Sequence, residues 1–372
     1  MRMERKAILR QDLSDLDNLL AGKVTAIIVQ PGKKLSELIA EMGNTGFQAR
    51  HLAAVVDVWE EMIQNRKLTI LLGYAGSMST TGQWKIINWL IENRFIDILV
   101  STGANISEDI VEAMGFSYWR APQKVDDIDV FKKNMNRYYD VLGKEDEYMK
   151  MTELIAEFIM TLNENQPYSS REFLYLFGLW LEKRRISSIV ATAARHGVPI
   201  YCPAIADSPY GDAALIAEAK GFHLVIDAMQ DYREFMLLGD KMDDTGVIYI
   251  GGGVPKDFIQ LLSVTADLQF KERKLPHRRN GVPRAGETYY PHKYAIQITT
   301  DSPQWGGLSG CTFEEAMSWG KEDPNAKHVQ VYCDATIALP LVAHAISERV
   351  ALKRTAPDFS WLFGDRRTEA VS

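Results

Sequence analysis

Residues 68–115 read LTILLGYAGSMSTTGQWKIINWLIENRFIDILVSTGANISEDIVEAMG, and this stretch decides the expected fold. The continuous apolar run at 68–74 is typical of a strand buried on both faces, and residues 82–94 predict the amphipathic helix that follows it. A second buried strand is expected over 96–101. The helix expected over 107–115 begins with a serine and early acidic residues, which suit the positive end of a helix. Strand and helix therefore alternate, as they do in a parallel sheet.

Outward from this stretch, the same alternation returns after a more helical middle part of the chain. Residues 145–162 and 170–185 carry apolar side chains at three- and four-residue spacing, which predicts two helices. The expected fold class is α/β, with a doubly wound, mostly parallel sheet of Rossmann-like topology and flanking helices. The remaining predicted strands are 199–204, 222–228, 247–250, 294–299 and 329–334, and the remaining predicted helices are 211–220, 230–238, 256–268 and 312–319.

The whole chain, residues 1–372, is expected to form a single domain, because no linker, repeat or low-complexity tract divides it. Residues 1–50 are interpreted as an N-terminal helical extension. Residues 271–292, KERKLPHRRNGVPRAGETYYPH, are basic and follow no periodic pattern. This segment is either a lid or basic contact for a partner or a solvated surface excursion, and the surface excursion is the preferred interpretation.

Charge and cysteine content argue against several classes of protein. The chain has 42 Lys and Arg against 49 Asp and Glu, so its net charge of −7 gives no general attraction to nucleic acid or to an anionic membrane. The three cysteines show no CxxC spacing and no Cys–His cluster, which argues against a metal site and favours a reducing compartment. Because no signal-peptide pattern and no apolar run of about 20 residues is seen, a cytoplasmic location is expected.

Ligands of open α/β sheets bind where strands end and helices begin. Five expected turns of this kind are rich in small or polar residues, at 73–82, 102–109, 207–212, 251–253 and 333–336. Small residues let the backbone approach a dinucleotide, and helix N-termini favour its phosphate groups. None of the five turns matches GxGxxG, so the chain lacks the ordinary Rossmann fingerprint.

The most specific pattern lies in the C-terminal part of the chain. Residues 315–321 read EAMSWGK, and residues 331–335 follow the pattern V-Y-x-D-A. Together they closely resemble the active-site segment of the deoxyhypusine synthases. The other turns follow that family's order, with LGY…TTG, STGAN, PAxxDxxxGD and GGGVPK, and the resemblance spans residues 68–350.

The resemblance implies an NAD-dependent transferase that moves an aminobutyl group through a lysine-bound imine. In that family a hydride passes to NAD from the carbon beside the secondary amine of spermidine. A lysine attacks the resulting imine, diaminopropane leaves, and an acceptor amine then takes the four-carbon arm before the hydride returns. By match Lys321 is the nucleophile, whereas on its own it could simply mark a helix C-terminus. A lysine attacks only as the neutral amine, which burial beside apolar groups promotes.

The same match implies binding residues for the amine and for the dinucleotide. Asp212 and Glu315 match acids that hold ammonium groups, although Asp212 could instead, or in addition, cap a helix. Trp319 would offer an aromatic face to a cationic amine. The residues that match NAD-binding positions are Thr80, Thr102, Gly103, Glu108, Asp207, Gly251, Gly253, Thr300, Asp334 and Ala335.

Several substrate positions depart from the eukaryotic members of that family. At the position of Ser77 those enzymes have asparagine, and at the position of Ser107 they have an acid. At the position of Asp257 they have the first residue of a histidine pair. Where this chain reads Leu308, Ser309 and glycine, they read D-S-G. Two partners for a cationic amine are lost and Asp257 is gained, while Ser309 remains a candidate substrate residue.

These departures predict that imine transfer is retained with a different donor, a different acceptor, or both. A small diamine acceptor, as in homospermidine synthesis, is preferred. The alternative acceptor is a lysine of a translation initiation factor, and ordinary spermidine binding could be restored by an acid from residues 271–292. An alternative of another class is a non-catalytic NAD-binding protein. The resemblance also implies a homotetramer with active sites at subunit interfaces.

Overall fold

The computed structural model describes residues 20, 22–273, 283–284, 287–288, 291–351, 354–355 and 357–363. Six strands form its central sheet in the order β11-β10-β7-β1-β2-β6. Every neighbouring pair in this sheet is parallel. The strands are β1 (Leu68–Tyr74), β2 (Ile98–Ser101), β6 (Ile200–Tyr201), β7 (Asp244–Ile250), β10 (His292–Thr299) and β11 (Glu322–Tyr332).

The strand order has the doubly wound form that was predicted. Counted along the chain, the six strands lie in the order 3-2-1-4-5-6 from β6 to β11, so the direction of winding reverses between β1 and β7. Strand β1 is buried along its whole length because it pairs with β2 on one side and β7 on the other. A strand with neighbours on both sides and helices on both faces needs a continuous apolar sequence, and LTILLGY supplies it.

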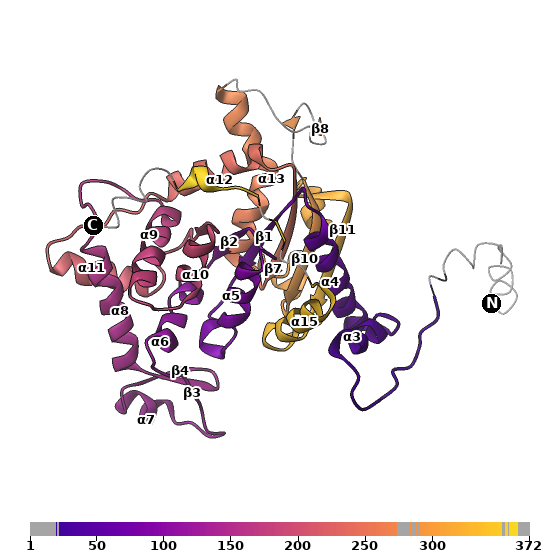
Figure 1. Cartoon of the computed structure of the whole chain (residues 1–372), viewed down its shortest axis with the longest axis horizontal. Coiled ribbons are helices and arrows are strands. Elements are labelled where there is room, and N and C mark those ends of the chain that lie inside the picture. The colour runs from indigo at the N-terminus through magenta and orange to yellow at the C-terminus, as the bar shows by residue number, and fades with distance from the viewer. Residues whose placement is uncertain are drawn as a thin grey trace, which may run out of the picture.

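Helices cover both faces of this sheet, and the side chains of β1 alternate between the two layers. Ile70 and Leu72 pack with α4 (Phe47–Gln64), α5 (Trp84–Glu92) and α15 (Ala335–Arg349). Leu71 packs on the other face with α12 (Ala228–Lys241) and α13 (Gly253–Arg273). Figure 1 shows these two sets of helices on opposite sides of the sheet. In the part of the chain that the structure covers, no helix is both long and apolar enough to span a membrane.

The other elements surround this three-layer core. The remaining helices are α3 (Leu35–Gly43), α6 (Asp109–Ala113), α7 (Asp127–Lys132), α8 (Glu145–Ile159), α9 (Ser170–Lys183), α10 (Ile189–His196), α11 (Pro209–Ala219) and α14 (Phe313–Ser318). Strands β3 (Trp119–Arg120), β4 (Met135–Tyr138) and β5 (Val141–Lys144) form a small antiparallel sheet, and β8 (Pro283–Arg284) pairs with β9 (Glu287–Thr288).

Some expectations from the sequence differ from the structure. The predicted strand at 222–228 is wrong: among the described residues its strand-like pairing is a single bridge between Ile226 and Tyr168, and α12 begins at the end of this segment with Asp227 as its N-cap. The predicted helical extension over residues 1–50 is helical only from Leu35 within its described part. Most of the predicted excursion at 271–292 lies outside the described residues.

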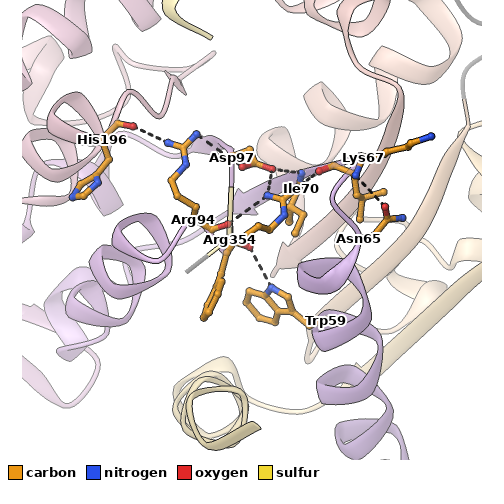
Figure 2. A network of polar contacts seen from close by, with 10 residues as sticks. Trp59, Asn65, Lys67, Ile70, Arg94, Asp97, His196 and Arg354 are labelled. Carbon is orange, nitrogen blue, oxygen red and sulfur yellow. Dashed lines mark hydrogen bonds and ion pairs between the residues drawn. The ribbon is translucent and has the colours of Figure 1, made fainter. Parts of the chain in front are cut away.

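A buried polar network ties the chain after α15 to the amino ends of β1 and β2 (Figure 2). Arg354 donates to the Asp97 carboxylate at 2.6 Å and to the carbonyl oxygen of Leu68. The same carboxylate accepts the backbone N–H of Ile70 at 2.8 Å, and Arg94 donates to the carbonyl oxygen of His196 at 2.7 Å. The network therefore stabilises the amino ends of these strands, whereas ligands bind at the carboxyl ends in such folds.

Candidate active site

A cavity of about 410 Å³ lies at the carboxyl ends of the strands, where the winding reverses between β1 and β7. Turns that follow four different strands line it, together with one residue of the loop before α14. This is the position at which doubly wound sheets bind their ligands. The lining residues are Ala75, Gly76 and Met78 after β1, Gly251–Gly253 after β7, Ile298–Asp301 around the end of β10, Cys333–Thr336 after β11, and Ser309.

The glycine turn after β7 is shaped by close contact with a second loop. A Cβ on Gly252 would overlap the backbone of Ser309, and Gly251 has a φ of +73°, which favours glycine. Gln297 holds the two loops together, because its side-chain amide donates to the carbonyl oxygens of Gly251 at 2.8 Å and of Ser309 at 2.9 Å. Ser309, which the sequence suggested as an amine-binding residue, therefore lines this cavity and donates to Asp301.

Two helices begin at the cavity and point their N-termini toward it. Helix α13 starts at Gly253 and α15 at Ala335, and both residues line the cavity. Asp334 caps α15 by accepting the backbone N–H of Thr336 at 2.7 Å. The helix dipoles favour an anion such as a phosphate here. Five of the ten predicted dinucleotide residues line the cavity: Gly251, Gly253, Thr300, Asp334 and Ala335.

The other predicted dinucleotide residues lie in neighbouring turns. Thr102 joins the turn after β2 to the turn after β1 by donating to the Gly76 carbonyl oxygen at 2.7 Å. Gly103 and the turn that contains the exposed Asp207 lie against each other, because a Cβ on Gly103 would overlap the Ser208 side chain. These contacts bring the turns after β1, β2 and β6 together at one edge of the sheet.

Glu108 lies in a buried polar group behind the turn after β1. Its carboxylate accepts a hydrogen bond from Ser77, and the buried Thr80 donates to the Ser77 carbonyl oxygen at 2.9 Å. Burial raises the pKa of Glu108 to about 7, although the Ser77 hydroxyl opposes the shift. The fully buried Ser107 donates to the Gly103 carbonyl oxygen at 2.9 Å, so its side chain is used within the fold.

Lys321 is positioned by the way α14 ends. Gly320 has a φ of +80°, and the backbone N–H groups of Gly320 and Lys321 bond back to Met317 and Ala316. This is the Schellman arrangement, in which a glycine takes the left-handed position after the helix. The glycine between Trp319 and Lys321 is therefore needed to end the helix. Lys321 comes directly before β11, and only 10% of its side chain is exposed.

The Lys321 amine forms an ion pair with Asp257, at 3.0 Å between Nζ and Oδ1. Asp257 lies just after the first turn of α13, four residues after the cavity residue Gly253. The ring of Trp319 lies 5.5 Å from Nζ, and this tryptophan is 61% exposed. The structure thus places three predicted substrate or catalytic residues together, about one helical turn along α13 from the glycine turn, and none of the three is among the residues that line the cavity.

Two buried ionisable groups next to this cluster were not predicted from the sequence. Lys256 is fully buried and donates to Gln297 Oε1 at 2.9 Å and to the Cys311 carbonyl oxygen at 2.7 Å. Burial lowers its pKa to about 8. Glu322 is also buried, with its pKa raised to about 8, and accepts from Gln260 at 3.4 Å. The available signal was local: Lys256 ends the GGGVPK motif, and Glu322 follows Lys321.

The two predicted amine-binding acids lie in different parts of the chain. Glu315 is in the first turn of α14, exposed, and close enough to Cys311 to help burial raise the pKa of that thiol. Asp212 is exposed in the first turn of α11, where Ser208 and not Asp212 occupies the N-cap position. Strands β6 and β11 are the opposite edge strands of the sheet, and about 24 Å of sheet lies between these two strands at a strand spacing of roughly 4.8 Å. Within the described residues, no contact joins Asp212 to Lys321.

Comparisons with known sequences point to one family. Residues 37–346 match the family model described as deoxyhypusine synthase. A protein named probable deoxyhypusine synthase 2 from Methanosarcina mazei is 44% identical, covering 92% of this chain and 96% of that protein. Another of the same name from Archaeoglobus fulgidus is 46% identical, covering 82% and 95%. The deoxyhypusine synthase-like protein of Chlorobaculum tepidum is 35% identical, covering 87% and 89%.

A solved structure carries the same fold. The crystal structure of an Entamoeba histolytica protein assigned to the deoxyhypusine synthases aligns with a TM-score of 0.60, covering 89% of this chain and 99% of that one. The two sequences are only 18% identical, so this likeness speaks for the fold alone. Taken with the matched family model and the relatives at 35–46% identity, it leads to one conclusion. The chain belongs to the deoxyhypusine synthase family.

Proposed function

We propose that this protein is an NAD-dependent transferase that moves an aminobutyl group from a polyamine such as spermidine, through an imine on Lys321, to a small diamine. The observation that carries the proposal is the 3.0 Å contact between Lys321 and Asp257, which lies four residues after the cavity residue Gly253. A lysine with a largely buried stem and a reachable amine suits imine formation. A carboxylate next to it suits a substrate whose nitrogens are positively charged.

The residues of the cavity fit NAD. Gly252 carries no side chain that would fill the space, and the N-termini of α13 and α15 favour the pyrophosphate. Asp334 and Thr300 would lie beside the sugar hydroxyls. When bound, NAD would accept the hydride from the polyamine and return it to the transferred group. The chain's own residues would hold the cofactor, exclude water and position the amine near Lys321.

The choice of a small diamine as acceptor rests on how charge is distributed around the site. This chain has Ser107 and Leu308 at two positions where eukaryotic family members have acids. The Ser107 hydroxyl is already bonded to the Gly103 carbonyl oxygen. Asp257 instead places a carboxylate directly at the nucleophile, where it could receive the ammonium group of a free diamine. A buried ammonium without a counter-charge is strongly disfavoured, so moving the acids changes which amine binds.

The pattern of relatives supports a task different from that of the ordinary family members. Archaeoglobus fulgidus has proteins named probable deoxyhypusine synthase 1 and 2, to which this chain is 36% and 46% identical. In Methanosarcina mazei the corresponding values are 36% and 44%. This chain is therefore more similar to the second type in each organism. Two types kept in one organism are readily understood if they act on different acceptors.

We further propose that the complete site forms between subunits of a homotetramer. Asp212 lies in the helix that follows β6 and Lys321 directly before β11, and about 24 Å of sheet separates these two edge strands, which argues against both residues of one subunit holding one short amine. A second copy could bring its Asp212 to the Lys321 of the first. The exposed ring of Trp319 would then become covered.

The test is to incubate the protein with NAD, spermidine and a panel of acceptors, and to identify the products by mass spectrometry. The panel should contain putrescine, other diamines and the archaeal or eukaryotic initiation factor. Wild type should make homospermidine from putrescine, and Lys321→Ala should make none. Transfer only to the initiation factor would replace the diamine by a protein acceptor. No product and no borohydride-trapped adduct would contradict the enzyme assignment.

A further inference from the structure

The pair between Lys321 and Asp257 is open on one side. The lysine side chain is 10% exposed, whereas 41% of the aspartate side chain remains exposed. The carboxylate therefore contacts the lysine nitrogen with one oxygen, Oδ1, while the group as a whole is accessible to a ligand. An accessible carboxylate in direct hydrogen-bond contact with a nucleophile has the geometry of a general base.

The other ionisable groups around this pair are less suited to that role. Lys256 on α13 is a cation that already donates to Gln297 and Cys311. Glu322 on β11 has its pKa raised to about 8 by burial, so at neutral pH it is mainly protonated and cannot accept a proton. Glu315 on α14 acts to raise the pKa values of Lys256 and Cys311. In the region that the structure describes, it has no hydrogen bond to Lys321.

We propose that Asp257 is the proton-transfer partner of Lys321, taking protons from the lysine nitrogen as it attacks and delivering them to the amine that departs. This inference rests on the proposed imine transfer and assigns one of its steps to a named residue. It differs from a simple binding role, because a residue that only held the ammonium would not be needed once the substrate is in place.

The step balances without any further reactant. Lys321 begins as an ammonium, and the oxidised polyamine begins as a protonated imine with one hydrogen on its nitrogen. One proton passes from Nζ to Asp257, the freed lone pair forms a bond to the imine carbon, and Asp257 returns the proton to the substrate nitrogen. A second proton passes from Nζ to Asp257, the lone pair freed on Nζ expels the departing amine as its bond to carbon breaks, and Asp257 then delivers this proton to the released amine. The products are a protonated imine on Lys321 and a departing ammonium, with the same protons and the same charge as the start.

The experiment separates the hydride step from the lysine step in a single turnover. Enzyme, NAD and spermidine are mixed, reduced NAD is followed by its fluorescence, and the Lys321 adduct is trapped with borohydride at increasing times. The variants are Asp257→Asn, which keeps the shape of the side chain, and Asp257→Ala, which leaves room for added formate. Glu314→Gln removes a nearby exposed carboxylate on α14 and serves as the matched control.

We expect Asp257→Asn to slow adduct formation at least about 100-fold while reduced NAD forms within a few-fold of the wild-type rate. Formate should restore adduct formation in Asp257→Ala, and Glu314→Gln should behave as wild type. Adduct formation at the wild-type rate in both Asp257 variants would overturn the proposal. Equal loss of both signals without rescue by formate would overturn it too, in favour of a binding role. If wild type itself forms neither reduced NAD nor an adduct, it is the proposed function that fails.

Discussion

Two ion pairs in this protein combine similar chemical groups but differ in their surroundings. Asp97 and Arg354 meet at 2.6 Å, with side chains 0% and 2% exposed, and the carboxylate also holds the backbone of β1. Asp257 and Lys321 meet at 3.0 Å, with side chains 41% and 10% exposed. The Asp97–Arg354 pair has fixed partners and is closed to solvent, and it is the closed pair below. The Asp257–Lys321 pair can exchange a partner or a proton, and it is the open pair. Burial and the number of fixed partners thus separate a structural pair from a chemical one.

The largest expected effect follows from removing the nucleophile of the open pair. Lys321→Met should lower aminobutyl transfer at least about 1,000-fold, because it removes the amine that forms the imine in the proposed reaction. Its free energy of unfolding should change by less than about 1 kcal/mol, since the lost pair is partly exposed. Product formation and urea unfolding measure the two effects. Transfer that survives in Lys321→Met but disappears in Lys256→Met would move the nucleophile to the buried lysine.

The opposite outcome is expected for the closed pair. Arg354→Met removes the 2.6 Å cationic partner of the buried Asp97 carboxylate and leaves it the longer 4.0 Å ion pair with Arg94, which should lower the free energy of unfolding by about 3–5 kcal/mol. The rate of adduct formation per folded molecule should stay close to that of wild type, because the network lies at the amino ends of the strands. Urea unfolding combined with borohydride trapping checks both. A small change in stability would mean that water or a neighbouring group compensates for the lost cation.

An intermediate case is Glu322, a buried acid beside the open pair. Its pKa is raised from 4.5 to about 8, so the folded state binds this proton more tightly than the unfolded state. The free energy of unfolding should therefore fall as the pH rises from about 4.5 to 8. Glu322→Gln should remove this loss, with a gain of about 4 kcal/mol at pH 8 and less than about 1 kcal/mol near pH 5. Equal effects at the two pH values would show that Glu322 ionises normally.

The smallest effect is expected on the free energy of unfolding when the acid of the open pair, Asp257, is replaced. Asp257→Asn should change the free energy of unfolding by less than about 1 kcal/mol, as is common for partly exposed ion pairs. Urea unfolding beside Asp97→Asn gives the direct contrast between the two pairs. A loss at Asp257 as large as that at Asp97 would remove the distinction and make the Lys321 pair structural.

The sequence was informative wherever structure depends on neighbouring residues. The apolar run at 68–74 predicted β1, and the glycine and acidic residues after the strands predicted the turns that line the cavity. The Glu315–Lys321 motif placed Trp319 and Lys321 together because one helix end carries both. The segment 222–228 looked like a strand because it is apolar, but no neighbouring strand was available to pair with it.

Contacts between distant residues could not be predicted in the same way. Asp257 and Lys321 are 64 positions apart, and Asp97 and Arg354 are 257 apart. Each contact depends on the order of strands in the sheet, which periodicity does not specify. The substitution at Asp257 could be seen in the sequence, but its direct contact with the lysine nitrogen came from the structure.

The most direct test of the account is a chase of the Lys321 adduct. The protein is incubated with NAD and spermidine, putrescine is then added, and samples are reduced with borohydride before and after the addition. Peptide mass spectrometry should find an aminobutyl group on Lys321 that disappears when putrescine is added, while homospermidine appears in equal amount. An adduct that persists in the presence of putrescine, or homospermidine formed without any adduct on Lys321, would contradict transfer through this lysine to a diamine.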